Sequence, residues 1–191
     1  EGAGDSGYMR SFSGRALQAG VAAHRFHMRT CGGIEHLCPT LYHAGLTSDL
    51  LEVLREFARE GCGPVFLVGF SLGGNLALNV CGREPTAAQD RVDCVVAVCP
   101  PLETERCVRQ LAAASGGFYD RHFVKVLLNQ LRRRRRAGLP PPAVELARRP
   151  RTLLEFDTLF TAPSAGFASV EAYYRAVDAM TAISQIRQPT L

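Results

Sequence analysis

The chain has 191 residues, of which 47% are hydrophobic and 21% are charged, and its net charge is +4 at pH 7. These values are typical of a globular protein of one domain and exclude a disordered or collagen-like chain. The sequence has no uninterrupted apolar run of about 18 residues, so it predicts no membrane-spanning helix. Seven cysteines without a C-x-x-C spacing argue against a zinc site and a disulfide framework. We therefore expect a reducing, cytoplasmic location.

The first half of the chain shows helical and strand patterns in alternation. Helices are expected over Tyr8–Gln18, from a cap at Thr47 or Ser48 to about Ala58, and over Leu72–Cys81. Strands are expected over Val21–Met28, Val65–Val68 and Val92–Val98. Strands that are apolar throughout and alternate with helices are typical of a parallel sheet buried on both faces. The pattern therefore predicts a doubly wound α/β layer.

The second half of the chain is helical in pattern. Helices are expected over Cys107–Ala114, Phe118–Arg136, Thr152–Phe160 and Val170–Ala179, before Ile186–Leu191 returns to strand character. We interpret residues 1–101 as the central part of a core, residues 102–184 as a helical cap, and residues 185–191 as the start of the next core strand. Both ends of the sequence lie in incomplete elements, so we expect a central fragment that lacks the first and last strands.

The segment "FLVGFSLGGNLAL" holds the pattern G-x-S-x-G between a predicted strand and a predicted helix. In a nucleophile elbow, this pattern lifts a serine out of a sharp turn, and small neighbours allow the two backbones to approach. Ser71 is then the nucleophile, Gly69 and Gly73 are the small neighbours, and the N–H of Leu72 is an oxyanion donor at a helix N-terminus. The alternative is a glycine-rich packing corner without catalytic function.

Several further segments give the chain a family resemblance. The segments "MRTCGG", "LYHAGLTSDL", "FYDRHF", "LLEFDTLFTAPSAGFASVEAYYR" and "IRQPTL" accompany the elbow in order. Together they resemble the YheT-like α/β-hydrolases, which include bacterial hydrolases and eukaryotic esterases and lipases. The resemblance implies an α/β-hydrolase fold with a helical cap, and hydrolysis of a small ester or lipid through an acyl group on Ser71. It implies no metal and no cofactor. Thr30 departs from the family, which has glycine at this turn.

The resemblance also implies where the remaining catalytic groups lie. Glu1 and Gly2 match the end of the family's oxyanion loop, and the acid and histidine of the triad would follow the strand that begins at Pro189, beyond Leu191. The expected function is therefore that of a short-chain carboxylesterase or acylglycerol lipase, active only in a longer parent protein. A non-catalytic binding module of the same fold is the alternative, and an acyltransferase cannot be distinguished from a hydrolase by sequence.

Histidines and carboxylates within the chain offer no clear triad. His122 follows Ser71, but it lies in the predicted cap, and we interpret it as a polar cap residue. His43 either lines the rim of the pocket, together with Phe70, or forms a hydrogen bond within its loop. Three aspartates lie on predicted helices, where they are expected to be solvated or capping: Asp120, Asp157 and Asp178.

A block of five arginines, Arg132–Arg136, ends the predicted helix Phe118–Arg136. Cations at a helix C-terminus are favourable for the helix dipole, so we interpret the block as a solvated face of the cap. No aromatic residues interleave with it, so nucleic-acid binding is not expected. A weak contact with an anionic membrane surface is a further expectation. The sequence indicates no oligomeric state.

Overall fold

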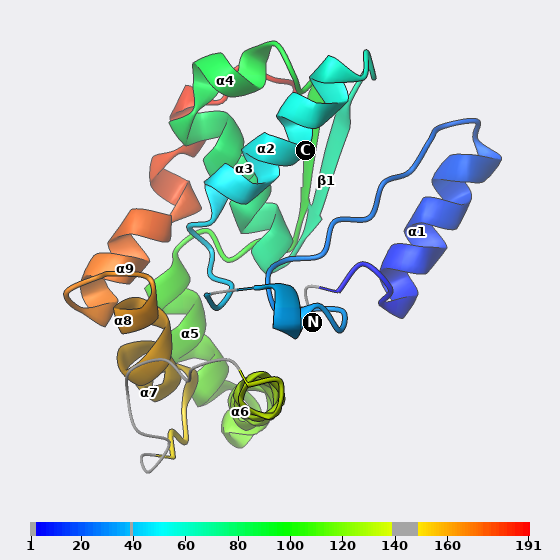
Figure 1. The fold of residues 1–191 in the computed structure, drawn as a ribbon. Helices are drawn as coiled ribbons and strands as arrows, with labels where there is room; N and C mark the ends of the chain where they lie inside the picture. The colour runs from blue at the N-terminus through cyan, green and yellow to red at the C-terminus, as the bar shows by residue number, and fades with distance from the viewer. Residues whose placement is uncertain (1–2, 39, 139–148) are drawn as a thin grey trace.

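A two-stranded parallel sheet forms the centre of the computed structural model, which describes residues 3–38, 40–138 and 149–191 (Figure 1). Strand β1 (Phe66–Phe70) pairs with β2 (Cys94–Val98), with Phe66 opposite Cys94. Parallel strands require a crossover, and here it consists of α3 (Leu72–Arg83) and α4 (Pro85–Gln89). The predicted alternation of strand and helix is confirmed in this region.

The C-terminal end of the chain returns to the sheet beside β2. Thr190 forms a parallel bridge with Val95. The N–H of Val95 donates to the carbonyl of Pro189 at 2.9 Å, and the N–H of Ala97 donates to the carbonyl of Leu191 at 2.8 Å. The predicted return to strand character near Ile186–Leu191 is therefore confirmed for its last residues.

Two expectations about the strands are wrong. Residues Val21–Met28 form no strand and run outside any helix or strand after α1. Within the described ranges, β1 has β2 on one side and no strand on the other, so this segment has no ladder partner there. The sheet is also not buried on both faces: Phe66 is 53% exposed and Val98 is 38% exposed. Helices α2 (Thr47–Arg59) and α3 cover one side of the sheet, whereas α1 (Gly7–Gln18), on the other side, buries none of its residues (Figure 1).

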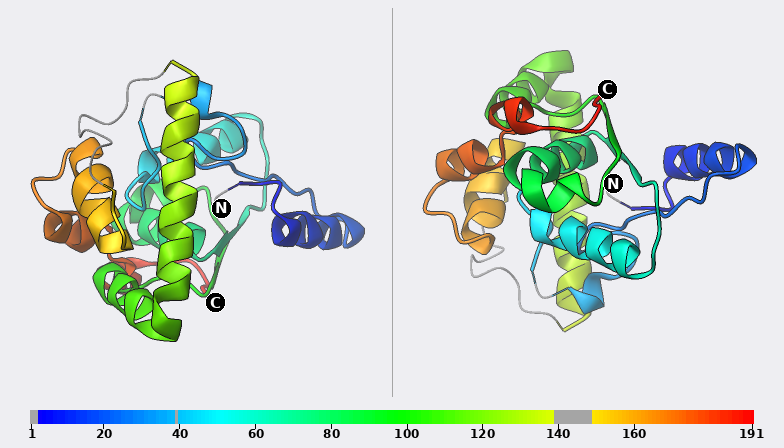
Figure 2. Two further views of the ribbon diagram at one scale, coloured as in Figure 1. Left: turned by 90° about the horizontal axis from the view of Figure 1, so that it is seen from below. Right: turned by 90° about the horizontal axis from the view of Figure 1, so that it is seen from above.

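The two helices before the sheet differ in how they pack. Helix α1 (Gly7–Gln18) buries none of its residues and stands apart from the other helices (Figures 1 and 2). Helix α2 (Thr47–Arg59) buries Leu50, Leu51 and Leu54. Its N-cap position is Leu46, and no side chain caps it, so the expected cap at Thr47 or Ser48 is wrong.

The expected helical patterns of the second half are confirmed in chain order. From residue 104 on, the helices and short turns are α5 (Thr104–Ala113), η2 (Ala114–Gly117), α6 (Phe118–Arg136), α7 (Leu153–Phe156), η3 (Asp157–Thr161), α8 (Ala162–Ser164), α9 (Val170–Val177), η4 (Ala179–Thr181) and η5 (Ile183–Gln185). One further short turn, η1 (Glu35–Leu37), precedes α2. Thr152 and Ser169 cap α7 and α9 by accepting hydrogen bonds from N–H groups three residues on. Among the described residues, no helix has the length and apolar character needed to cross a membrane. The boundaries of the cap at 102 and 184 stay predictions.

The arginine block is not one solvated face, as the sequence suggested. Arg134 is only 2% exposed, and its Nη1 donates to the carbonyl of Cys38 at 2.6 Å. Arg133 forms an ion pair with the buried Glu35 at 2.9 Å. Successive helical positions are rotated by about 100°, so five consecutive arginines surround the helix and one of them must face the core. Arg132, Arg135 and Arg136 remain exposed.

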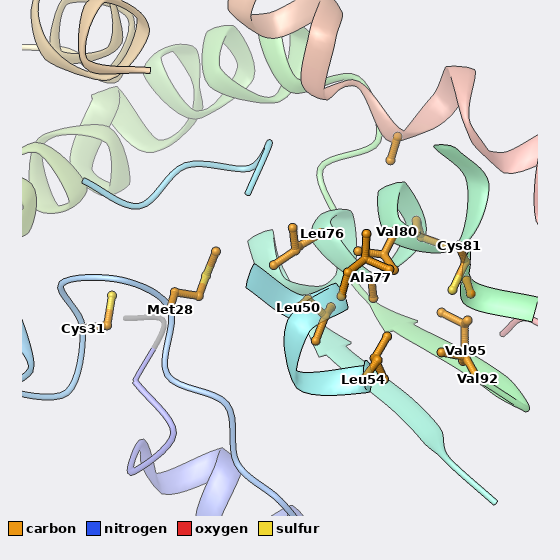
Figure 3. Packing of buried hydrophobic residues seen from close by; sticks show 14 residues of the cluster. Met28, Cys31, Leu50, Leu54, Leu76, Ala77, Val80, Cys81, Val92 and Val95 are labelled. Atoms are coloured by element: carbon orange, nitrogen blue, oxygen red, sulfur yellow. The ribbon is translucent and has the colours of Figure 1, made fainter. Parts of the chain in front are cut away.

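The main hydrophobic cluster lies where α2 and α3 meet the sheet. Leu50 and Leu54 of α2 face Leu76 and Val80 of α3, with Val95 of β2 beneath them (Figure 3). A second cluster joins Ala44, α5, α8 and α9, and the half-buried Leu72 packs against both clusters. The first residue of α3 is therefore held between the sheet and the helical second half of the chain.

Candidate active site

Ser71 lies in a strained turn between β1 and α3. Its backbone angles are φ 50° and ψ −121°, and the residue is exposed to solvent. A positive φ is uncommon for a residue with a side chain and costs on the order of 1–3 kcal/mol, so it persists only where neighbouring structure imposes it. Its position at the carboxyl end of a parallel strand is where open α/β sheets bind their ligands.

Backbone hydrogen bonds on both sides impose this conformation. The N–H of Ser71 donates to the carbonyl of Val98, at the end of β2, at 2.8 Å. The carbonyl of Ser71 accepts from the N–H groups of Gly74 at 2.9 Å and Asn75 at 3.1 Å. The residue is thus fixed to both the sheet and the first turn of α3, while its hydroxyl is left at the surface.

The glycines of the elbow are not equivalent. A Cβ at Gly69 would lie 2.3 Å from the carbonyl oxygen of Gly73, so only glycine fits there. A Cβ at Gly73 would meet nothing within 4 Å, whereas one at Gly74 would approach the carbonyl of Gly69 to 3.0 Å. The expected role of Gly69 is confirmed, but the second position of close approach is Gly74 and not Gly73.

Leu72 is the first residue of α3, and its N–H points along the helix axis like the other N–H groups of a first turn. The hydrogen bonds found among the described residues leave this N–H without an acceptor. Together with the positive end of the helix dipole, such a group favours a negatively charged oxygen beside Ser71. The second donor was expected just before Glu1, outside this chain, and the matching loop end at Glu1 and Gly2 lies outside the described residues.

A buried amide pair behind the elbow was not anticipated from the sequence. Asn75 and Asn79 are 0% and 1% exposed. The Nδ2 of Asn75 donates to the carbonyl of Pro101 at 2.8 Å, and the Nδ2 of Asn79 donates to the carbonyl of Val177 at 2.8 Å. These bonds join α3 to the loop after β2 and to the end of α9. Two asparagines four residues apart in an otherwise apolar helix were the available signal.

Phe70, an expected rim residue, precedes Ser71 and is half-buried. Its ring lies 5.2 Å from the ring of Tyr8 and 5.8 Å from that of Phe12. Both partners belong to α1, which otherwise stands apart. The side chain of Phe70 thus forms the contact between the elbow strand and α1.

His43, the other expected rim residue, has the hydrogen bond within its loop that the alternative interpretation required. Its Nδ1 accepts from the N–H of Gly45 at 3.1 Å, and its ring stands edge-on to those of Phe167 and Tyr173. Burial, and then the nearby charge of Arg29, lower the pKa of His43. The imidazole is therefore neutral near pH 7.

No histidine forms a hydrogen bond with the hydroxyl of Ser71 in the described part of the chain. His122 lies exposed on α6, with its ring 6.0 Å from that of Phe123. His24 packs on Phe57, with ring centres 4.5 Å apart. The residues described here therefore supply a strained serine and an oxyanion donor, but no general base in contact with that serine.

The three aspartates of the helical region differ from one another. Asp120 and Asp178 accept hydrogen bonds from the first N–H groups of α7 and α5, at 2.9 Å and 2.6 Å, so the capping interpretation is confirmed for them. Asp157 is neither solvated nor capping. Its carboxylate accepts from Thr161 at 2.6 Å and from Tyr174 at 2.9 Å, and burial raises its pKa to about 6.

Thr30 adopts the conformation that glycine adopts most readily, with φ 60°. It is fully buried, and the Nε2 of Gln130 on α6 donates to both its carbonyl, at 2.5 Å, and its hydroxyl, at 2.6 Å. The turn therefore keeps a left-handed conformation although the residue is threonine. No group of three or more histidine, cysteine, aspartate or glutamate side chains within the described ranges could hold a metal ion.

Comparison with known proteins found one matching family and several similar proteins. The model of the "Alpha/beta hydrolase family" matches residues 2–190. The chain is 31% identical over 194 residues to YheT of Escherichia coli (strain K12), which is named a putative esterase, and the match covers 100% of this chain and 56% of that protein. It is 25% identical over 172 residues to the monoacylglycerol lipase of Saccharomyces cerevisiae, with 86% of this chain and 38% of that protein covered.

A cyanobacterial relative gives a similar match. The chain is 28% identical over 207 residues to slr0264 of Synechocystis, which is also named a putative esterase, with 98% of this chain and 55% of that protein covered. The chain thus spans about half the length of the bacterial relatives that it matches. No solved structure matches significantly.

Proposed function

Since the chain belongs to the alpha/beta hydrolase family, we propose that it carries the nucleophile of a carboxylic ester hydrolase and that this nucleophile is Ser71. The observation that carries the proposal is the backbone of Ser71, with φ 50° at an exposed position between β1 and α3. Strain of this kind is a feature of functional sites. In a merely structural corner, glycine would avoid it.

The proposed reaction has two steps. The Oγ of Ser71 attacks the ester carbonyl carbon, the C–O bond to the alcohol breaks, and the acyl group remains on the serine. Water then attacks the acyl-serine and releases the carboxylic acid. In both steps the carbonyl oxygen becomes negatively charged, and the N–H of Leu72 at the start of α3 stabilises it.

A base must accept the proton of Ser71, because the hydroxyl is a weak nucleophile near pH 7. Within the described residues no histidine contacts Ser71, so the proposal requires an acid–histidine pair from the part of the relatives' length that this chain does not span. The substrate is proposed to be a short-chain ester or a monoacylglycerol. The name of the yeast relative and the helices beside Leu72 support this choice.

The test is the variant Ser71→Ala in the full-length protein. Hydrolysis of p-nitrophenyl butyrate should fall at least 1000-fold, while the melting temperature stays within a few degrees of the wild type. A fluorophosphonate probe should label the wild type at Ser71, as peptide mass spectrometry would show. Undiminished turnover in Ser71→Ala would contradict the proposal. An absence of both turnover and labelling in the wild type would favour the non-catalytic binding module.

A further inference from the structure

Helix α6 carries an unusual concentration of positive charge. Its nineteen residues include seven lysines and arginines and one carboxylate, so its net charge of +6 exceeds the +4 of the whole chain, and the rest of the chain is net negative. The one carboxylate, Asp120, is 2% exposed and accepts a hydrogen bond from the backbone of Leu153. It therefore cannot compensate the cations on the outside of the helix.

The exposed arginines of α2 and α5 have carboxylate partners close by in the chain. Arg55, Arg59, Arg106 and Arg109 each pair with a glutamate three or four residues away. Arg121, Lys125 and Arg132, which are exposed on α6, have no carboxylate partner in the ranges that the structure describes. Arg121 bonds to the carbonyl of Gly116 and Arg132 to the amide of Asn129. Both arginines bond to uncharged groups, so their charge is not compensated.

Three of these cations line a hollow of about 310 Å³ between α6 and the residues just before α7. The hollow is lined by Arg121, Val124, Lys125, Leu128, Arg132, Pro150 and Arg151. Positions 121, 125 and 132 lie on one stripe of a helix, since their spacings are close to whole turns. Four exposed cations thus stand around an apolar floor, in which Val124 and Pro150 are buried.

The stripe lies on the outside of the molecule. In the left view of Figure 2, α6 runs across the front, and no other helix covers it. Gln130, Arg133 and Arg134 on its other side bond to Thr30, Glu35 and Cys38. One side of α6 is thus attached to the core, and the other presents cations. A helix of this length spans about 28 Å and offers a nearly flat row of charges.

We propose that this outer face of α6, with Arg151, docks on an anionic lipid surface. Each lysine or arginine beside such a surface raises the affinity of a protein for it by about fivefold. An apolar floor between the cations suits the region where headgroups meet acyl chains. A nucleic acid is the less suitable occupant, because no aromatic side chain lines the hollow and base stacking has no platform. This proposal does not depend on the activity of Ser71.

The experiment is co-sedimentation of the full-length protein with sized vesicles. Vesicles of 30% phosphatidylserine in phosphatidylcholine are compared with vesicles of phosphatidylcholine alone, at low and at high salt. The test variant is Lys125→Gln/Arg132→Gln. The control is Arg10→Gln/Arg15→Gln, which removes the same charge from exposed positions on α1. Removing two cations from the docking face should weaken binding to the anionic vesicles about 30-fold.

Each outcome decides the proposal. The proposal is supported if the wild type binds anionic vesicles only, the α6 double variant loses this binding and the α1 double variant keeps it. Equal losses of vesicle binding in the two double variants would show that binding depends on net charge alone, and would overturn the proposal. No binding to anionic vesicles, or vesicle binding that is abolished by competing single-stranded RNA at equal phosphate, would also overturn it. Turnover of a soluble ester without vesicles should be the same in all three proteins, which separates this result from a failure of the proposed activity.

Discussion

At the scale of single residues, the shape of the elbow depends on Gly69 more than on Gly73. A Cβ at Gly69 would overlap the backbone of Gly73, so Gly69→Ala should lower the free energy of unfolding by about 3 kcal/mol. A Cβ at Gly73 meets nothing within 4 Å. Gly73→Ala, the matched control, should change stability by less than about 1 kcal/mol in either direction. Urea denaturation of both variants measures the difference, and equal losses would contradict the geometry described for the turn.

Asp157 should make stability depend on pH. Its folded pKa is raised to about 6 from an unfolded value near 3.8, because burial penalises the charged carboxylate. The folded state therefore binds the proton more tightly, and stability falls as the pH rises from about 4 to about 6. The loss is on the order of 2–3 kcal/mol, since one pKa unit corresponds to about 1.4 kcal/mol.

The variant Asp157→Asn isolates this contribution. An amide does not ionise, so the stability of the variant relative to the wild type should rise by on the order of 2–3 kcal/mol between pH 4 and pH 7. Denaturant unfolding at several pH values measures it. The control is Asp5→Asn, at an exposed carboxylate. Parallel pH profiles for the wild type and Asp157→Asn would show that the carboxylate is as well solvated in the fold as in the unfolded chain.

The sequence predicted a turn with an exposed serine at Ser71, but not the buried polar side chains behind this turn. The elbow is local: a strand, five residues and a helix determine its shape, and all of them are read from one short segment. The buried pair Asn75 and Asn79 bonds to Val177, about a hundred residues later, and the hydroxyl of Tyr174 bonds to Asp157. Such partners come together only when helices pack, so helical spacing alone suggested solvated groups.

At the scale of elements, α6 is attached to the loop between Thr30 and Thr40 by buried polar side chains. Arg134→Ala should remove the bond to the carbonyl of Cys38 and leave that acceptor without its partner, at a cost of about 2–4 kcal/mol. Arg135→Ala, at the next and exposed position, should cost less than about 0.5 kcal/mol. Thermal and urea unfolding compare the pair. Similar small effects would mean that the arginine block is solvated throughout, as the sequence suggested.

Helices were predicted better than strands, for a physical reason. A helix such as Phe118–Arg136 forms its hydrogen bonds within one segment, so its spacing of apolar residues is sufficient to predict it. A strand needs a neighbour. Val21–Met28 has a strand-like composition, but no strand pairs with it in the described chain, whereas the residues near Thr190 find β2. The sequence shows which segments favour an extended backbone, but it does not show which strand each of them would pair with.

At the scale of the whole molecule, the composition predicted a chain without a disulfide framework, and all seven cysteines are free. They lie at all depths of the structure. Cys62 and Cys99 are exposed, Cys94 and Cys107 are half-buried, and Cys31, Cys38 and Cys81 are buried. Burial raises the pKa of Cys31 to about 11 and that of Cys81 to about 12, so neither forms an appreciable amount of the reactive thiolate near pH 8.

Thiol titration should therefore report the packing of the chain. With an aromatic disulfide reagent at pH 8, the two exposed cysteines of this chain should react within the first phase, and the three buried ones only after addition of guanidinium chloride. The variant Cys62→Ser/Cys99→Ser should lose the fast phase and keep the buried thiols. Because no disulfide links the described residues, a reductant should leave the melting temperature unchanged. Fast reaction of Cys31 or Cys81 in the native protein, located by peptide mapping, would mean that the cluster between α2, α3 and the sheet opens far more readily than its burial indicates.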